Sequence, residues 1–175
     1  MNARTHSHPR VLVTWESKHG STADISYAIA GVLREHGVRV ALSRAEEADI
    51  DDTYDGFVIG SAVYAGHWMK HAKHFVQEYS QKLLTRPVWL FSSGPVGTPP
   101  KPDEPAVDVA AMMECTAAED HKIFGGKLDP EQMTFPERAI TRALHAPYGD
   151  FRDFDAIRAW AAQIAEQLTK VEVTS

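Results

Sequence analysis

The sequence predicts an α/β protein built on a doubly wound parallel sheet of five strands, in the order 2-1-3-4-5, with helices on both faces. Short apolar runs alternate with segments of helical periodicity, as βα units require. The 175 residues, of which 43% are apolar, suit one domain of ordinary size. Because parallel strands are joined by right-handed crossovers, the doubly wound order is the leading topology.

The first βα unit lies near the start of the chain. An apolar strand is expected at residues 11–13, and the next helix places Ile25, Ile29 and Leu33 on one face before it stops at Gly37. The remaining strands are expected at residues 38–42, 57–59, 88–91 and 122–124. Further helices are expected at about residues 72–83, 106–119 and 155–168.

The domain organisation follows from these elements. We expect a single domain over residues 10–172, preceded by a flexible N-terminal tail at residues 1–9. Residues 127–150 are long for a connection between a fifth strand and its helix, and they contain a helical candidate at 136–145. We interpret residues 127–150, called the insert below, as shaping a partner or substrate surface.

Composition excludes several classes of function. The net charge of −6 comes with no basic stripe, so we expect no nucleic-acid partner. Cys115 is the only cysteine, which rules out an intramolecular disulfide or a thiolate redox pair, so redox chemistry would need a cofactor. His67, His71 and His74 share a helical spacing without a nearby acid or thiol, and we predict no metal site. We expect no transmembrane segment and a cytoplasmic location. Peripheral membrane contact and oligomeric state are left open.

The loop after the first strand has the composition of a phosphate-binding loop. Residues 14–22, called the phosphate loop below, read TWESKHGST and lead directly into a helix, whose N-terminus favours an anion. Its hydroxyls belong to Thr14, Ser17, Ser21 and Thr22, and Gly20 lets a ligand approach the backbone closely. Capping of the helix by Ser21 or Thr22 is the simpler alternative, but one cap needs only one hydroxyl. The triphosphate and dinucleotide glycine motifs are absent, which favours a monophosphate.

The motif Ser17-x-x-Gly20-x-Thr22 resembles the FMN-phosphate loop of the flavodoxin family. The shape of the Gly60 to His67 segment and the insert are similar to one branch of the flavodoxin superfamily, which contains menaquinone-dependent protoporphyrinogen dehydrogenase. The resemblance covers nearly the whole chain, and the phosphate loop is its most specific part.

The resemblance implies FMN as the cofactor, with an electron-transferring ring in a flat apolar slot. Three loops at the carboxyl edge of the sheet would hold it. The expected cofactor-binding residues are Thr14, Ser17, Lys18, His19, Gly20, Ser21, Thr22, Ser61, Ala62, Val63, Tyr64, Gly66, Ser93, Gly94, Pro95, Val96 and Gly97. Tyr64 or Trp68 could stack on the ring, or both could be ordinary core or rim aromatics. Tyr64 and His67 are the candidates for proton transfer.

Two departures from simple flavodoxins bear on function. No aromatic residue follows the fourth strand in Ser92 to Gly97, so one ring face would stay open, which suits a substrate. Glu16 lies within the phosphate loop, directly before the Ser17 to Thr22 motif, and we expect it to face solvent or to pair with Lys18, because a carboxylate would repel a phosphate. A receiver module would need an aspartate at the end of the third strand, where Gly60 and Ser61 stand instead.

Positive charge adds a further indication. Basic side chains near the two ligand loops would attract a carboxylated substrate such as a porphyrin, although they could also be solvated helix-start residues. They belong to Lys18, His19, His67, Lys70 and His71. The leading hypothesis is an FMN-dependent oxidoreductase that takes electrons from an organic substrate, of the protoporphyrinogen type, and passes them to a quinone. The alternative is a non-enzymatic FMN electron carrier that docks redox proteins through its acidic surface.

Overall fold

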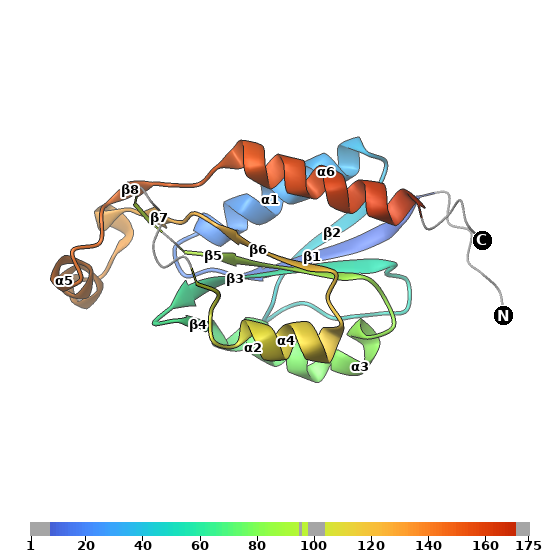
Figure 1. Ribbon diagram of the computed structural model, residues 1–175, viewed down its shortest axis with the longest axis horizontal. Coiled ribbons are helices and arrows are strands. Elements are labelled where there is room, and N and C mark those ends of the chain that lie inside the picture. The colour runs from blue at the N-terminus through green and yellow to red at the C-terminus, as the bar shows by residue number, and fades with distance from the viewer. Residues whose placement is uncertain (1–7, 95, 98–103, 171–175) are drawn as a thin grey trace.

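The computed structural model describes residues 8–94, 96–97 and 104–170. A parallel sheet in the order β2-β1-β3-β5-β6 lies between two helical layers (Figure 1). Its strands are β1 (Arg10–Glu16), β2 (Arg39–Arg44), β3 (Gly56–Tyr64), β5 (Val88–Ser93) and β6 (Asp120–Phe124). The short β4 (His67–Trp68) pairs antiparallel with the end of β3. Numbered by parallel strands alone, this order is the predicted 2-1-3-4-5, and the predicted fold class is confirmed.

The helices cover both faces of the sheet. One face carries α1 (Ser21–Glu35) and α6 (Phe154–Lys170), and the other carries α2, α3 and α4 (Figure 1). The bounds of the second layer are Lys70–Glu78 for α2, Ser80–Leu83 for α3 and Val109–Thr116 for α4. Each face has its own apolar core, which is why the strands read as continuous apolar runs rather than as alternating ones.

Alternation along β1 assigns its side chains to the two cores. Val11 and Val13 pack in the core that contains α1 and α6, whereas Leu12 packs in the core of α2 and α4. Thr14 and Glu16 therefore share the face of Leu12. This placement decides where the charge of Glu16 lies.

Several elements differ from their predicted lengths. β3 continues past the apolar run to Tyr64, because its backbone pairs with β1 and β5 as far as Ala62 and then with β4 at Val63 and Tyr64. The predicted helix at 72–83 is divided into α2 and α3 at Tyr79. The predicted helix at 106–119 is shorter, since Ala117 adopts a left-handed conformation with φ 49° and ends α4.

The insert stands beyond the carboxyl edge of the sheet (Figure 1). It starts with β7 (Lys127–Leu128) and ends with β8 (Gly149–Asp150), which pair antiparallel with each other. A short 3₁₀ turn, η1 (Pro130–Gln132), and the helix α5 (Phe135–Ala143) lie between them. A reciprocal cap between Thr134 and Glu137 fixes the start of α5, and Pro136 lies in its first turn.

The ends of the chain lie partly outside the described residues. Within the expected tail, residues 1–7 are not described, whereas Pro9 is buried and its carbonyl accepts a hydrogen bond from the backbone N–H of Arg39 at 2.8 Å. Among the described helices, none is both long and apolar enough to cross a bilayer.

Candidate functional site

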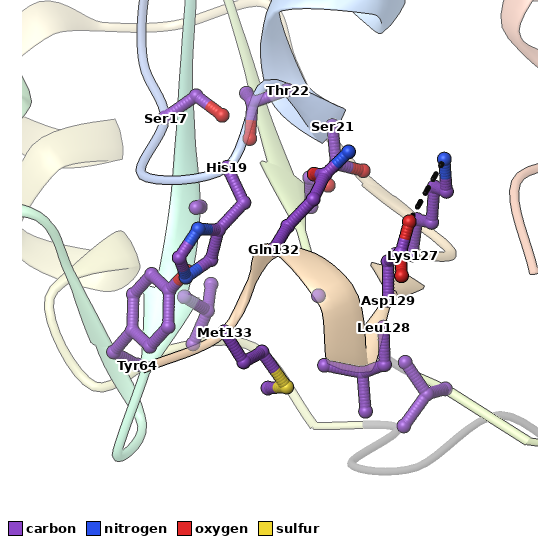
Figure 2. A pocket seen from close by; sticks show the side chains of 16 residues that line it. Ser17, His19, Ser21, Thr22, Tyr64, Lys127, Leu128, Asp129, Gln132 and Met133 are labelled. Carbon is purple, nitrogen blue, oxygen red and sulfur yellow. Dashed lines mark ion pairs between the residues drawn. The ribbon is translucent and has the colours of Figure 1, made fainter. Parts of the chain in front are cut away.

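A cavity lies at the carboxyl edge of the sheet, where the phosphate loop, the ends of β3 and β5 and the insert meet (Figure 2). Ten of the predicted cofactor residues line it: Ser17, His19, Ser21, Thr22, Ala62, Val63, Tyr64, Ser93, Gly94 and Val96. The remaining wall is formed by Gly126, Lys127, Leu128, Asp129, Gln132 and Met133. The sequence therefore predicted the three loops that meet at this cavity, but not the wall that Gly126 and the insert form.

Two hydroxyls at the phosphate-loop end have no partner. Ser21 Oγ and Thr22 Oγ1 are buried and form no hydrogen bond with any described residue. Burying a hydroxyl without a partner is costly, so such groups usually have a role. The alternative that one of them caps α1 is wrong, because no side chain caps this helix. Two free hydroxyls beside an uncapped helix N-terminus form a site suited to an anion.

The backbone of the phosphate loop is shaped for the same purpose. Gly20, immediately before α1, has φ 84°, a conformation that favours glycine. Its N–H donates to Ser17 Oγ at 3.0 Å, which holds the loop against the start of the helix. Gly20 and Lys18 do not themselves line the cavity.

Glu16 corrects one prediction. Its carboxylate neither faces solvent nor pairs with Lys18: the residue is buried and accepts a hydrogen bond from the backbone N–H of Ala72 at 2.8 Å, with His71 Nδ1 also at 2.8 Å. The free N–H groups and positive dipole of the first turn of α2 stabilise this charge. Thr14 lies on the same face of β1; its hydroxyl is buried and unpaired among the described residues, but it does not line the cavity.

Tyr64 forms one side of the cavity (Figure 2). The turn after it places both Ala65 (φ 48°) and Gly66 (φ 79°) in the left-handed region, as a tight two-residue hairpin requires. Burial, and then the charge of Glu137, raise the pKa of Tyr64 to about 12, so its hydroxyl stays protonated at neutral pH. Lys18 Nζ lies 5.8 Å from the centre of the Tyr64 ring.

Trp68 is a core residue. Only 2% of it is exposed, and its indole N–H donates to Ser92 Oγ at 2.7 Å. Ser92 Oγ lies 2.8 Å from His121 Nε2, which extends the buried network towards β6. Of the two aromatic residues considered for ring stacking, Tyr64 alone lines the cavity.

Besides Thr14, Lys18 and Gly20, three described residues that were predicted to bind the cofactor do not line the cavity: Ser61, Gly66 and Gly97. Ser61 is buried beneath the end of β3, and its hydroxyl accepts from the N–H of Met69 at 2.9 Å. The Gly66 carbonyl accepts from Val107 N at 2.9 Å. Gly97 lines a separate shallow hollow near Arg152. Pro95 lies outside the described residues.

The basic side chains near the site are mostly paired. His67 Nδ1 lies 3.2 Å from Asp108, and His71 is held by Glu16. Lys18 and His19 both meet Glu137 of the insert. His67, the second candidate for proton transfer, does not line the cavity. The described residues contain no group of three metal-ligating side chains. Four of the five side chains of the predicted basic rim therefore contact a carboxylate.

The wall of the cavity that was not predicted begins directly after β6. Its backbone passes so close to the β5 loop that a Cβ on Gly126 would lie 3.0 Å from the Cα of Gly94. Gly125 and Gly126 directly after the fifth parallel strand were the available signal, because paired glycines at this edge permit close approach of a backbone or a ligand.

The parallel sheet and a cavity at its carboxyl edge define a flavodoxin-like α/β protein. The family model described as Flavodoxin domain matches residues 12–155, and the chain belongs to this family. The expected family resemblance is thereby confirmed. A curated relative, protoporphyrinogen IX dehydrogenase [quinone] of Escherichia coli K12, is 26% identical over 99 residues, which are 55% of this chain and 54% of the relative. The match thus spans about half the length of that relative.

Solved structures show the same fold. The flavodoxin of Megasphaera elsdenii aligns with a TM-score of 0.61 at 17% identity, covering 89% of this chain and 98% of that one. Rubredoxin oxygen:oxidoreductase of Desulfovibrio gigas aligns with a TM-score of 0.65 at 15% identity, covering 96% of this chain and 38% of that one.

Proposed function

We propose that this protein binds FMN at the cavity and works as an oxidoreductase that takes electrons from a protoporphyrinogen-type substrate and passes them to a quinone. The observation that carries FMN binding is the pair of buried, unpartnered hydroxyls, Ser21 Oγ and Thr22 Oγ1, beside the uncapped start of α1. The substrate and acceptor are supported by the E. coli relative, which is named a protoporphyrinogen IX dehydrogenase [quinone].

The residues present fit this cofactor. Ser17, Ser21 and Thr22, with the first N–H groups of α1, would hold the phosphate, and the dipole of α1 would stabilise its charge. The ring would lie against the ends of β3 and β5. When bound, FMN supplies reversible transfer of one or two electrons.

Tyr64 is the candidate for positioning a proton. Because its pKa is raised to about 12, its hydroxyl is a neutral hydrogen-bond donor over the physiological range. It could orient a carbonyl or carboxylate at the cavity, but it would be a poor base. We therefore assign Tyr64 to binding and orientation, and leave the redox step to the cofactor.

The insert supplies the surface for the redox partners. Met133 and Leu128 bring apolar atoms to the cavity. Beyond them, α5 and the residues after it expose large apolar side chains: Phe135, Ile140, Leu144 and Tyr148. An apolar surface beside the cavity suits a lipid-soluble quinone. It also suits peripheral contact of a cytoplasmic protein with a membrane.

An FMN electron carrier is the second candidate. The net charge of −6 favours docking of a basic redox protein, as expected of a carrier. Turnover discriminates the two functions, because a carrier exchanges electrons with a protein partner but does not oxidise a porphyrinogen at a useful rate.

The test begins with the visible absorption spectrum of the purified protein. Apoprotein is then titrated with FMN and, in parallel, with riboflavin, which lacks the phosphate. Tighter binding of FMN than of riboflavin supports the phosphate site, and equal affinities would contradict it. Quinone-dependent oxidation of protoporphyrinogen by the FMN-loaded protein would support the enzymatic function. Reduction of the bound FMN without turnover of protoporphyrinogen would favour the electron carrier. A protein that ignores both flavins would overturn the proposal.

A further inference from the structure

A single carboxylate links the insert to the phosphate loop. Glu137 of α5 and His19 are 118 positions apart in the chain, yet Glu137 Oε1 lies 3.2 Å from His19 Nε2. The same oxygen is ion-paired with Lys18 Nζ. Oε2 accepts from the backbone N–H of Thr134 at 2.7 Å and from its hydroxyl at 2.9 Å. One oxygen thus caps α5, while the other contacts the Lys18 ammonium and the His19 imidazole of the phosphate loop.

This carboxylate lies close to the place where a phosphate would bind. His19 lines the cavity together with Ser17, so one imidazole ring separates Glu137 from the cavity. Only 16% of the Glu137 side chain is exposed, against 47% for Lys18. A shielded charge is weakly screened by solvent, so the field of Glu137 extends into the cavity.

We infer that Glu137 is a positioning residue that sets the affinity of the site for the FMN phosphate, by competing with it for Lys18 and His19. This inference rests on the proposed function. A phosphate at Ser21 and Thr22 would bring up to two negative charges to a place where Lys18 and His19 already contact Glu137. The docked insert therefore weakens phosphate binding. By thermodynamic reciprocity, the bound phosphate weakens docking of the insert.

The Glu137→Gln variant tests the competition. Glutamine also suits this position of a helix cap, so α5 keeps its start while the charge is lost. We expect FMN affinity to rise about 3- to 10-fold, the size of one removed repulsion at a partly shielded site. Riboflavin affinity should not change. The matched control is Glu131→Gln, which removes an exposed carboxylate of the same insert at η1 and should leave both affinities unchanged.

A second variant should change FMN affinity in the opposite direction. Lys18→Gln leaves the charge of Glu137 less compensated and should weaken FMN binding by a similar factor. The double variant should return to near the wild-type affinity. Weaker FMN binding by Glu137→Gln, or equal changes for FMN and riboflavin, would overturn the inference.

Hydrogen exchange at the backbone amides of α5 measures the reciprocal effect, the weakening of insert docking by the bound phosphate, and it does not depend on enzyme activity. In the wild type these amides should exchange faster with FMN bound than with riboflavin bound, and in Glu137→Gln the two flavins should give equal rates. Equal rates in the wild type would overturn the inference while leaving FMN binding intact. A wild type that binds no FMN overturns the proposed function as well, and this is seen in the first titration.

Discussion

Replacement of Thr22 by valine tests two effects of its buried hydroxyl separately: its cost to the stability of the ligand-free protein and its contribution to FMN binding. Thr22 is fully buried, and its Oγ1 has no hydrogen-bond partner among the described residues. A buried unsatisfied hydroxyl costs about 1–3 kcal/mol, and valine has the same shape without it. Ligand-free Thr22→Val should therefore be more stable than the wild type by about 1 kcal/mol or more. The same change should weaken FMN binding, because a hydrogen bond to a charged acceptor contributes about 1.5–3 kcal/mol, which is roughly 10- to 150-fold in affinity.

The assay combines urea unfolding of the apoprotein with fluorescence titration by FMN and riboflavin. Thr116→Val is the matched control: Thr116 is also buried, but its hydroxyl donates to the Met112 carbonyl at 2.7 Å. This control should lose stability and keep its FMN affinity. If Thr22→Val loses stability and binds FMN as the wild type does, the hydroxyl has a partner within the protein, and assignment of the phosphate to this loop is refuted.

Three further perturbations follow from the packing and the charges. Gly60→Ala should destabilise by about 1–3 kcal/mol in urea unfolding, since its Cβ would lie 2.1 Å from Cζ of the buried Phe91; a stability equal to the wild type would contradict this close packing. Burial lowers the pKa of His121, so on acidification the unfolded chain binds a proton at this residue at a higher pH than the folded protein does. The free energy of unfolding should therefore decrease as the pH drops below about 6.5. His121→Gln should reduce the pH dependence of the free energy of unfolding in this range, and an unchanged slope would show that His121 is not its source. Met133→Ala should weaken FMN and riboflavin equally, by about 1 kcal/mol, because it removes an apolar side chain that lines the cavity in which we propose that the flavin ring lies; a loss confined to FMN would place Met133 at the phosphate.

The sheet could be predicted because its signals are local. Apolar runs at residues 57–59 and 88–91 mark strands buried on both faces, and connection rules then fix their order. The convergence of the phosphate loop with Tyr64 and Gly94 follows from the topology alone, since all lie at the carboxyl edge of the sheet. None of these steps requires knowledge of a side-chain contact.

The errors share a different cause, because they concern charged and aromatic side chains whose partners lie far along the chain. Glu16 meets Ala72, 56 positions away, and the sequence near Glu16 shows no sign of this helix N-terminus. For Trp68 the sequence left ring stacking and a core or rim position open, and only the structure shows that it is buried against Ser92. Only the packed fold determines which of several possible partners a charge or an indole meets.

The insert shows how local and distant signals combine at one site. A helix was predicted at residues 136–145, close to α5, whereas the contact of α5 with the phosphate loop, between Glu137 and Lys18, joins residues far apart in the sequence. The phosphate-loop end of the cavity therefore uses groups of the loop after β1 and of the first turn of α1, which adjoin in sequence, and the opposite wall comes from a segment more than a hundred residues later. We therefore expect a change in the insert to alter FMN affinity and partner contact without moving the hydroxyls of the phosphate loop. We therefore expect the comparison of FMN with riboflavin to show whether a variant acts through the phosphate, even where, as with Glu137, the changed residue belongs to the insert.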